Sequence, residues 1–216
     1  MERKTALTDN IVITIIYVIF LVGVIGHIIA ATFPLMLKIT PYVLLILGHL
    51  LILRFAATKS TNVLIWIIAV FLFTFCMEVI GVKTGWIFGE YRYGSTLGSR
   101  VFDVPVIIGF NWTFVILGAI SLSQRITKNK YLVVLSTGII AVIFDLILEP
   151  IAVRLDYWQW TNNEIPVMNY IAWFLIAVIS AILFYVIKPV KLTMLPAKYL
   201  LVQFTFFFIL SLLSAG

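Results

Sequence analysis

The chain has 216 residues, of which 63% are hydrophobic and only 11% are charged, and its formal net charge is +6. A typical soluble domain contains about 25% charged residues, so this composition excludes an ordinary water-soluble protein. The basic residues lie in short segments between apolar runs and form no continuous stripe, which disfavours nucleic acid as a partner.

Seven apolar runs follow one another along the chain, and each is near the ~20 residues that a membrane-spanning helix needs. The sequence therefore predicts an all-α, polytopic membrane helix bundle with about seven transmembrane helices and a single domain, residues 1–216. The first run is longer than the ~7–15-residue core of a signal peptide, so no cleaved leader is expected. The runs are Ile11–Ala31, Leu35–Leu53, Val63–Gly81, Val104–Ser121, Tyr131–Ile151, Pro166–Ile187 and Ala197–Leu213.

Lysine and arginine are divided unequally between the two ends of this predicted bundle, ten against five. The positive-inside rule then places the N-terminus in the cytoplasm. We expect a multi-pass protein of the cell (plasma or inner) membrane. The ten are Arg3, Lys4, Arg54, Lys59, Arg125, Lys128, Lys130, Lys188, Lys191 and Lys198. The acids show the opposite bias, with seven of nine at the outer end: Glu78, Glu90, Asp103, Asp145, Glu149, Asp156 and Glu164.

Residues 63–121 and 131–187 carry the same features in the same order, which predicts an internal repeat. Each unit is a helix that ends in an acid, an aromatic loop, and a proline-led helix with a tryptophan seven positions after the proline. Two helical turns separate that proline and tryptophan, so both lie on one face. Coincidence in a sequence rich in aromatic residues remains the alternative. The paired residues are Glu78 and Glu149, Pro105 and Pro166, and Trp112 and Trp173.

Three acids lie within the predicted helices: Glu78, Asp145 and Glu149. A charge in a membrane costs roughly 2.5–3.5 kcal/mol on insertion scales, so such residues usually face the bundle interior. Asp145 and Glu149 are four residues apart and share one helix face. If one is protonated and the other ionised, they form an acid and a base side by side. A structural network with Lys83 or Arg154 explains these acids equally well.

The aromatic residues next to these acids have two explanations. Tryptophan and tyrosine anchor proteins at membrane interfaces, but aromatic faces also stabilise cations. Asn111 and Asn169 are amides within apolar helices, where they fix a water or carboxyl group or hold helices together. His27 and His49 stand alone and lack metal-ligand spacing. Metal, nucleotide and serine-nucleophile motifs are missing from the sequence, so neither a cofactor nor a metal is expected.

Together these motifs resemble the membrane carotenoid hydratase family, which includes carotenoid 1,2-hydratases and bisanhydrobacterioruberin hydratase-like proteins. The resemblance runs from Glu78 to Trp173, nearly half of the chain, and Glu149 stands where the family pattern commonly has aspartate. It rests on Glu78-x-x-Gly81-x-x-x-Gly85-x-x-x-Gly89-x-Tyr91-x-Tyr93, Val104-Pro105 with Trp112, Asp145-x-x-x-Glu149-Pro150, Tyr157-Trp158-x-Trp160 and Pro166-x-x-Asn169-x-x-x-Trp173.

The resemblance implies a cofactor-independent hydro-lyase that adds water across the terminal 1,2 (1′,2′) double bond of an acyclic carotenoid by acid-initiated carbocation chemistry. Its partners would be a carotenoid substrate in the lipid bilayer, water and other carotenoid biosynthesis enzymes. The implied catalytic residues are Glu78, Asp145 and Glu149. The implied substrate-binding residues are Trp86, Tyr91, Tyr93, Asn111, Trp112, Trp158, Trp160, Asn169 and Trp173.

Two other functions remain open from the sequence. A proton-initiated membrane carotenoid or terpene cyclase would use the same first step but close a ring in place of adding water. A non-catalytic seven-helix protein could bind a lipid or pigment. A retinal protein is disfavoured because Lys198 lies at the start of the last predicted helix, whereas retinal needs a lysine midway along it.

Overall fold

The computed structural model describes residues 2–58, 60–187 and 192–213, and the side chains of the first segment from Thr8 onward. This described part contains seven α-helices, each long and apolar enough to cross a membrane, and four short strands. The prediction of an all-α, multi-pass membrane protein is thereby confirmed. The elements are α1 (Glu2–Ile28), α2 (Phe33–Ala57), α3 (Thr61–Thr84), β1 (Tyr91–Tyr93), β2 (Arg100–Val101), β3 (Val104–Pro105), α4 (Val106–Ile126), α5 (Lys130–Arg154), β4 (Trp158–Trp160), α6 (Val167–Val186) and α7 (Leu195–Leu213).

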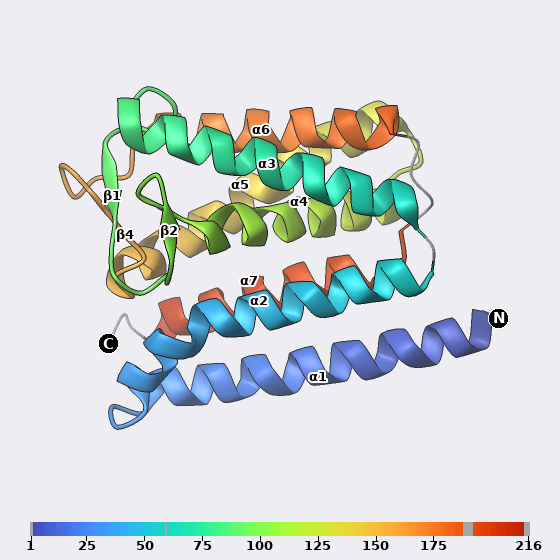
Figure 1. The fold of residues 1–216 in the computed structure, drawn as a ribbon, viewed down its shortest axis with the longest axis horizontal. Coiled ribbons are helices and arrows are strands. Elements are labelled where there is room, and N and C mark those ends of the chain that lie inside the picture. Colours follow the sequence, from blue (N-terminus) through green and yellow to red (C-terminus); the bar gives the residue numbers. More distant parts are fainter. Residues whose placement is uncertain (1, 59, 188–191, 214–216) are drawn as a thin grey trace.

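The helices run side by side along the long axis of the molecule, and α4 lies at their centre (Figure 1). Helix α4 packs against α3, α5 and α7, and it buries a larger share of its apolar length than any other described helix. The outer helices expose large apolar side chains such as Ile68, Leu72 and Ile179. An apolar surface of this extent is unfavourable in water but suits contact with lipid.

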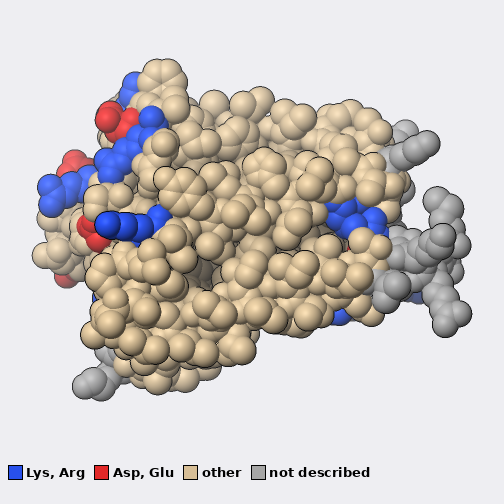
Figure 2. Space-filling model, turned by 60° about the horizontal axis from the view of Figure 1, so that its bottom comes forward, with Lys and Arg blue, Asp and Glu red and all other residues tan. Residues whose placement is uncertain are grey.

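The charged residues gather at the two ends of the molecule and leave an apolar belt between them (Figure 2). All four strands lie at one end, which we call the strand end (Figure 1). The cytoplasmic position of the N-terminus stays a prediction. Among the lysines counted for it, Lys59, Lys188 and Lys191 lie outside the described residues, as do the side chains of Arg3 and Lys4.

The starts of α4 and α6 differ from the prediction. The expected helix from Val104 begins two residues later, because Val104 and Pro105 pair as a strand with Val101 and Arg100. Pro105 and Pro166 are both N-cap residues with extended backbone, at ψ 125° and 139°. Each proline therefore precedes the first helical turn and does not lie within it.

Candidate functional site

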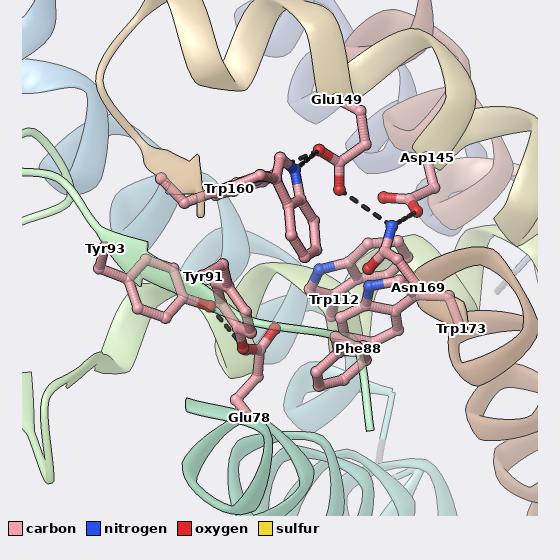
Figure 3. Close-up of a pocket in the computed structure, with 11 residues that line it drawn as sticks. Glu78, Phe88, Tyr91, Tyr93, Trp112, Asp145, Glu149, Trp160, Asn169 and Trp173 are labelled. Carbon is pink, nitrogen blue, oxygen red and sulfur yellow. Dashed lines mark hydrogen bonds between the residues drawn. The ribbon is translucent and has the colours of Figure 1, made fainter. Parts of the chain in front are cut away.

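A single pocket at the strand end contains the three acids that the sequence singled out (Figure 3). Glu78 comes from the second-last turn of α3, and Asp145 and Glu149 come from successive turns of α5. All three are buried, with exposures of 4%, 0% and 1%. The remaining lining residues are Phe88, Tyr91, Tyr93, Trp112, Trp158, Trp160, Asn169 and Trp173.

Strands β1 and β4 bring the two aromatic loops together. They pair antiparallel, with Tyr91 opposite Trp160 and Tyr93 opposite Trp158. Because alternate residues of a strand face the same side, all four of these rings turn toward the pocket. Arg92 in the middle of β1 faces away and is exposed. This sheet was not predicted from the sequence.

The two tyrosines of β1 hold Glu78. Both hydroxyls donate hydrogen bonds to Oε2 of Glu78, the one from Tyr93 at 2.6 Å. Burial, and after it the negative charge of Glu78, raises the pKa of Tyr91 and Tyr93 well above the usual value. Both hydroxyls therefore keep their protons and remain hydrogen-bond donors to the carboxylate.

The two tryptophans of β4 hold Glu149 in the equivalent way. The indole N–H groups of Trp158 and Trp160 donate to Oε2 of Glu149 at 3.0 and 2.9 Å. The amide nitrogen of Asn169 on α6 donates to the other oxygen, Oε1, at 3.0 Å. Glu149 thus accepts three N–H hydrogen bonds, more than Glu78 or Asp145 accepts among the described residues.

Asp145 has fewer partners. The same Asn169 nitrogen donates to its Oδ2 at 2.7 Å, so the amide bridges Asp145 and Glu149. The other oxygen of Asp145, Oδ1, is buried and has no hydrogen-bond partner among the described residues. In Figure 3 this free oxygen lies on the side of Asp145 that faces Glu149. The three carboxyl groups therefore differ in what holds them.

The sequence left open that these acids are held by ion pairs with Lys83 or Arg154, and the structure shows other partners. In the described part of the chain, neither Lys83 nor Arg154 forms an ion pair with them. Lys83 instead lies 4.9 Å from the centre of the Phe102 ring. The hydrogen-bond donors that hold the acids are the uncharged hydroxyl, indole and amide groups of tyrosine, tryptophan and asparagine.

Stacked rings form one wall of the pocket. The rings of Trp112 and Trp173 are 3.6 Å apart and nearly parallel, and Phe88 stacks on Trp173 at 5.1 Å. Trp112 also meets the edge of Phe144. The free volume inside the pocket is about 10 Å³, close to the minimum for one water molecule. The site is therefore narrow, with electron-rich ring faces beside the acids.

Two residues that the sequence placed at the site lie elsewhere. Trp86 is 83% exposed, because it follows Gly85, whose left-handed backbone (φ 70°) ends α3 and turns the chain outward. Asn111 does not line the pocket. It precedes Trp112, and adjacent helical residues point about 100° apart, so only one of them can face the acids.

Phe88 lines the pocket but was not among the predicted site residues. The signal for it is Gly81, because a Cβ at that position would lie 2.5 Å from the Phe88 ring. The glycine therefore makes the space that Phe88 occupies. Within the described residues, no group of three or more His, Cys, Asp and Glu residues is arranged to hold a metal ion.

The chain is similar to known carotenoid biosynthesis proteins. The family model described as "Carotenoid biosynthesis protein" matches residues 40–215. Bisanhydrobacterioruberin hydratase of Haloarcula japonica is 30% identical over 126 residues, which cover 55% of this chain and 43% of that protein. The match therefore spans less than half of that relative's length. No solved structure matches the chain. With most of its length matched by the family model, the chain belongs to the carotenoid biosynthesis protein family.

Proposed function

We propose that this protein hydrates the terminal 1,2 double bond of an acyclic carotenoid end. The observation that carries the proposal is a narrow, aromatic-lined pocket in which three buried carboxyl groups differ in their hydrogen-bond partners. Family membership and the similarity to a hydratase support carotenoid hydration over other acid-initiated reactions.

Asp145 is the proton donor in this proposal. Its Oδ2 accepts a hydrogen bond from Asn169, so the proton resides on the unpartnered Oδ1. Transfer of that proton to the less substituted alkene carbon forms a C–H bond from the alkene's electron pair. The neighbouring carbon, which carries two methyl groups, becomes a tertiary cation.

The aromatic wall stabilises that cation. A cation over an aromatic face gains about 0.5–2 kcal/mol, most when the site excludes water. The stacked Trp112, Trp173 and Phe88 supply such faces next to the carboxyl groups. Glu78, held by two tyrosines, adds negative charge on the opposite side of the pocket.

Glu149 is the general base in this proposal. A water molecule attacks the cation through an oxygen lone pair, and Glu149 accepts the proton that this water loses. The product is a tertiary alcohol, and the net change is the addition of one water. The proton then returns from Glu149 to Asp145. The amide nitrogen of Asn169 donates to both of these carboxyl groups and bridges them.

The test is expression of the protein in a host that makes acyclic carotenoids, followed by mass analysis of the pigments. We expect a product heavier by one water with the wild type, and none with Glu78→Gln, Asp145→Asn or Glu149→Gln. Glu164→Gln, at an exposed acid outside the pocket, is the matched control and should remain active. Immunoblots of the membrane fraction would show that each variant is present.

Two outcomes would contradict the proposal. Full hydration by all three acid variants would exclude the acid–base mechanism. A wild-type product of unchanged mass would indicate a cyclase, in which an internal alkene traps the same cation.

We further propose that the protein lies in the cell membrane with its N-terminus in the cytoplasm, takes its substrate from the bilayer and works beside other carotenoid biosynthesis enzymes. The uneven count of Lys and Arg supports this orientation. We also propose that residues 63–121 and 131–187 are repeated units. The matched roles of Tyr91 and Tyr93 at Glu78 and of Trp158 and Trp160 at Glu149 support that equivalence.

A further inference from the structure

The pocket of the three acids has too little room for a substrate. Its free volume is about 10 Å³, whereas an apolar cavity known to bind benzene measures ~150 Å³. The methyl-branched end of an acyclic isoprenoid is comparable with benzene in size, so it does not fit beside the lining side chains in their present positions. The structure therefore shows the site closed, and a lining side chain has to move before such an end can reach the acids.

Most of the side chains that line the pocket cannot leave it cheaply. Several donate hydrogen bonds to the carboxyl groups, and moving one of them would leave a buried oxygen without its partner. Trp112 and Trp173 are anchored in helices α4 and α6. Phe88 differs from both groups, because its side chain forms no hydrogen bond and it lies in the irregular segment between α3 and β1. The side chains that donate are those of Tyr91, Tyr93, Trp158, Trp160 and Asn169.

Phe88 is carried by a short turn, residues 85–89, that has a glycine at each end. Gly85 and Gly89 have φ values of 70° and 101°, in a region that glycine adopts readily and other residues do not. The N–H of Gly89 donates to the carbonyl oxygen of Gly85 at 3.2 Å and closes the turn. Among the described residues, the hydrogen bonds of this turn are all within itself or to the last turn of α3. It can therefore move without breaking a hydrogen bond to any other helix or strand.

The inner and outer sides of this turn differ in their surroundings. On the inner side, Phe88 is 1% exposed and its ring stacks on Trp173, with ring centres 5.1 Å apart. The ring also packs against Gly81, where a Cβ would lie 2.5 Å away. In Figure 3 it lies beside Trp173 on the side toward Glu78. On the outer side, Trp86 is 83% exposed, so an outward movement of the turn meets no obstacle from Trp86.

We propose that the methyl-branched end of an acyclic isoprenoid binds between the rings of Phe88 and Trp173, and that the turn of residues 85–89 moves outward to admit it. This inference rests on the proposed function, from which it takes its ligand. An end bound there has an aromatic face on each side and lies in the same pocket as the acids. The turn thus acts as the lid of the site, which opens for the substrate and then closes over it.

The direct test observes the ring at position 88 while a ligand binds. In the purified full-length protein in detergent, 4-fluorophenylalanine takes the place of Phe88, and its fluorine NMR signal is recorded as phytane is added. Phytane is a saturated isoprenoid hydrocarbon, so it has the methyl-branched end but no double bond that could react. We expect the signal to shift, because the ring loses its stack on Trp173. The same label in place of Phe184, a buried ring on α6 outside the pocket, is the matched control and should keep its signal.

Phe88→Ala provides an independent measurement. This variant removes the ring that has to move, so it should bind phytane about fivefold more tightly than the wild type, the equivalent of one aromatic stack. Native mass spectrometry from detergent measures this affinity. If Phe88 only fills space in the core, its loss should weaken binding or leave it unchanged. Phe184→Ala removes a buried ring outside the pocket and should leave the affinity for phytane unchanged.

A fluorine signal at position 88 that stays unchanged at saturating phytane would overturn the inference. Unchanged or weaker binding of phytane by Phe88→Ala would also overturn it, as would an equal gain in affinity by Phe184→Ala. Because phytane cannot be hydrated, the two proposals fail separately. A protein that shows the shift at position 88 but forms no hydrated pigment would refute the hydratase proposal alone. Hydration of pigment without that shift would refute the lid alone.

Discussion

Replacing Glu149 by glutamine separates the catalytic role of its carboxylate from its structural role. The carboxylate accepts three N–H hydrogen bonds, two from indoles on Oε2 and one from Asn169 on Oε1. A glutamine that keeps its oxygen toward the indoles turns its own NH₂ toward the Asn169 donor, so one bond is lost. A hydrogen bond to a charged group contributes about 1.5–3 kcal/mol. Removing a buried charge offsets part of this cost.

The expected result is a folded protein with little activity. Loss of a general base typically slows a reaction by about 10²–10⁴-fold, far more than the small change in thermal stability would cause. Pigment mass analysis gives the hydration rate, and thermal unfolding in detergent gives the stability. Glu149→Asp keeps a carboxylate and should retain measurable hydration. Wild-type hydration by Glu149→Gln would refute the role of this residue as base.

Three further predictions concern the surroundings of the acids. Because burial and the charge of Glu78 raise the pKa of Tyr91 and Tyr93, the folded protein keeps both phenolic protons where the unfolded chain loses them. Their contribution to stability should stay constant below about pH 10 and decline above it. Melting in detergent should show a smaller alkaline decline for the Tyr91→Phe/Tyr93→Phe double variant, and an equal decline would contradict this linkage. Gly109→Ala should lower the melting temperature more than Gly138→Ala. A Cβ at residue 109 would lie 3.1 Å from the backbone of Phe75, whereas a Cβ at residue 138 would meet only side chains, which can move more easily. The reverse order of melting temperatures would show that α3 and α4 can separate. Trp173→Leu removes the ring stacked between Trp112 and Phe88. This variant should reduce the rate of hydration about tenfold without loss of protein from the membrane. An unchanged rate would show that the stack does not stabilise the cation.

The helices could be predicted from the sequence because each apolar run is long enough to cross a bilayer by itself. The grouping of Asp145 with Glu149 was also predictable, since residues four apart share a helix face. Both features depend on one segment at a time, and no knowledge of its neighbours is needed.

The sheet that completes the site could not be predicted. Strands β1 and β4 have three residues each and are separated by more than sixty positions in the chain. Segments so short carry little periodicity of their own, and their pairing follows from the packing of α3 against α6. The same limit applies to Trp86 and Asn111, whose residue types suit the site but whose backbone directs them away from it.

The alternation of β1 and β4 also limits how this site can change in evolution. A one-residue deletion just before either strand would slip its pairing and turn every side chain to the opposite face. Arg92 would then replace Tyr91 and Tyr93 beside Glu78. Length variation is therefore compatible with the exposed turn at residues 161–164 but not with the segments that enter the strands. Changes in substrate range should accordingly arise by substitution of the lining rings, with the lengths of the segments that enter β1 and β4 preserved.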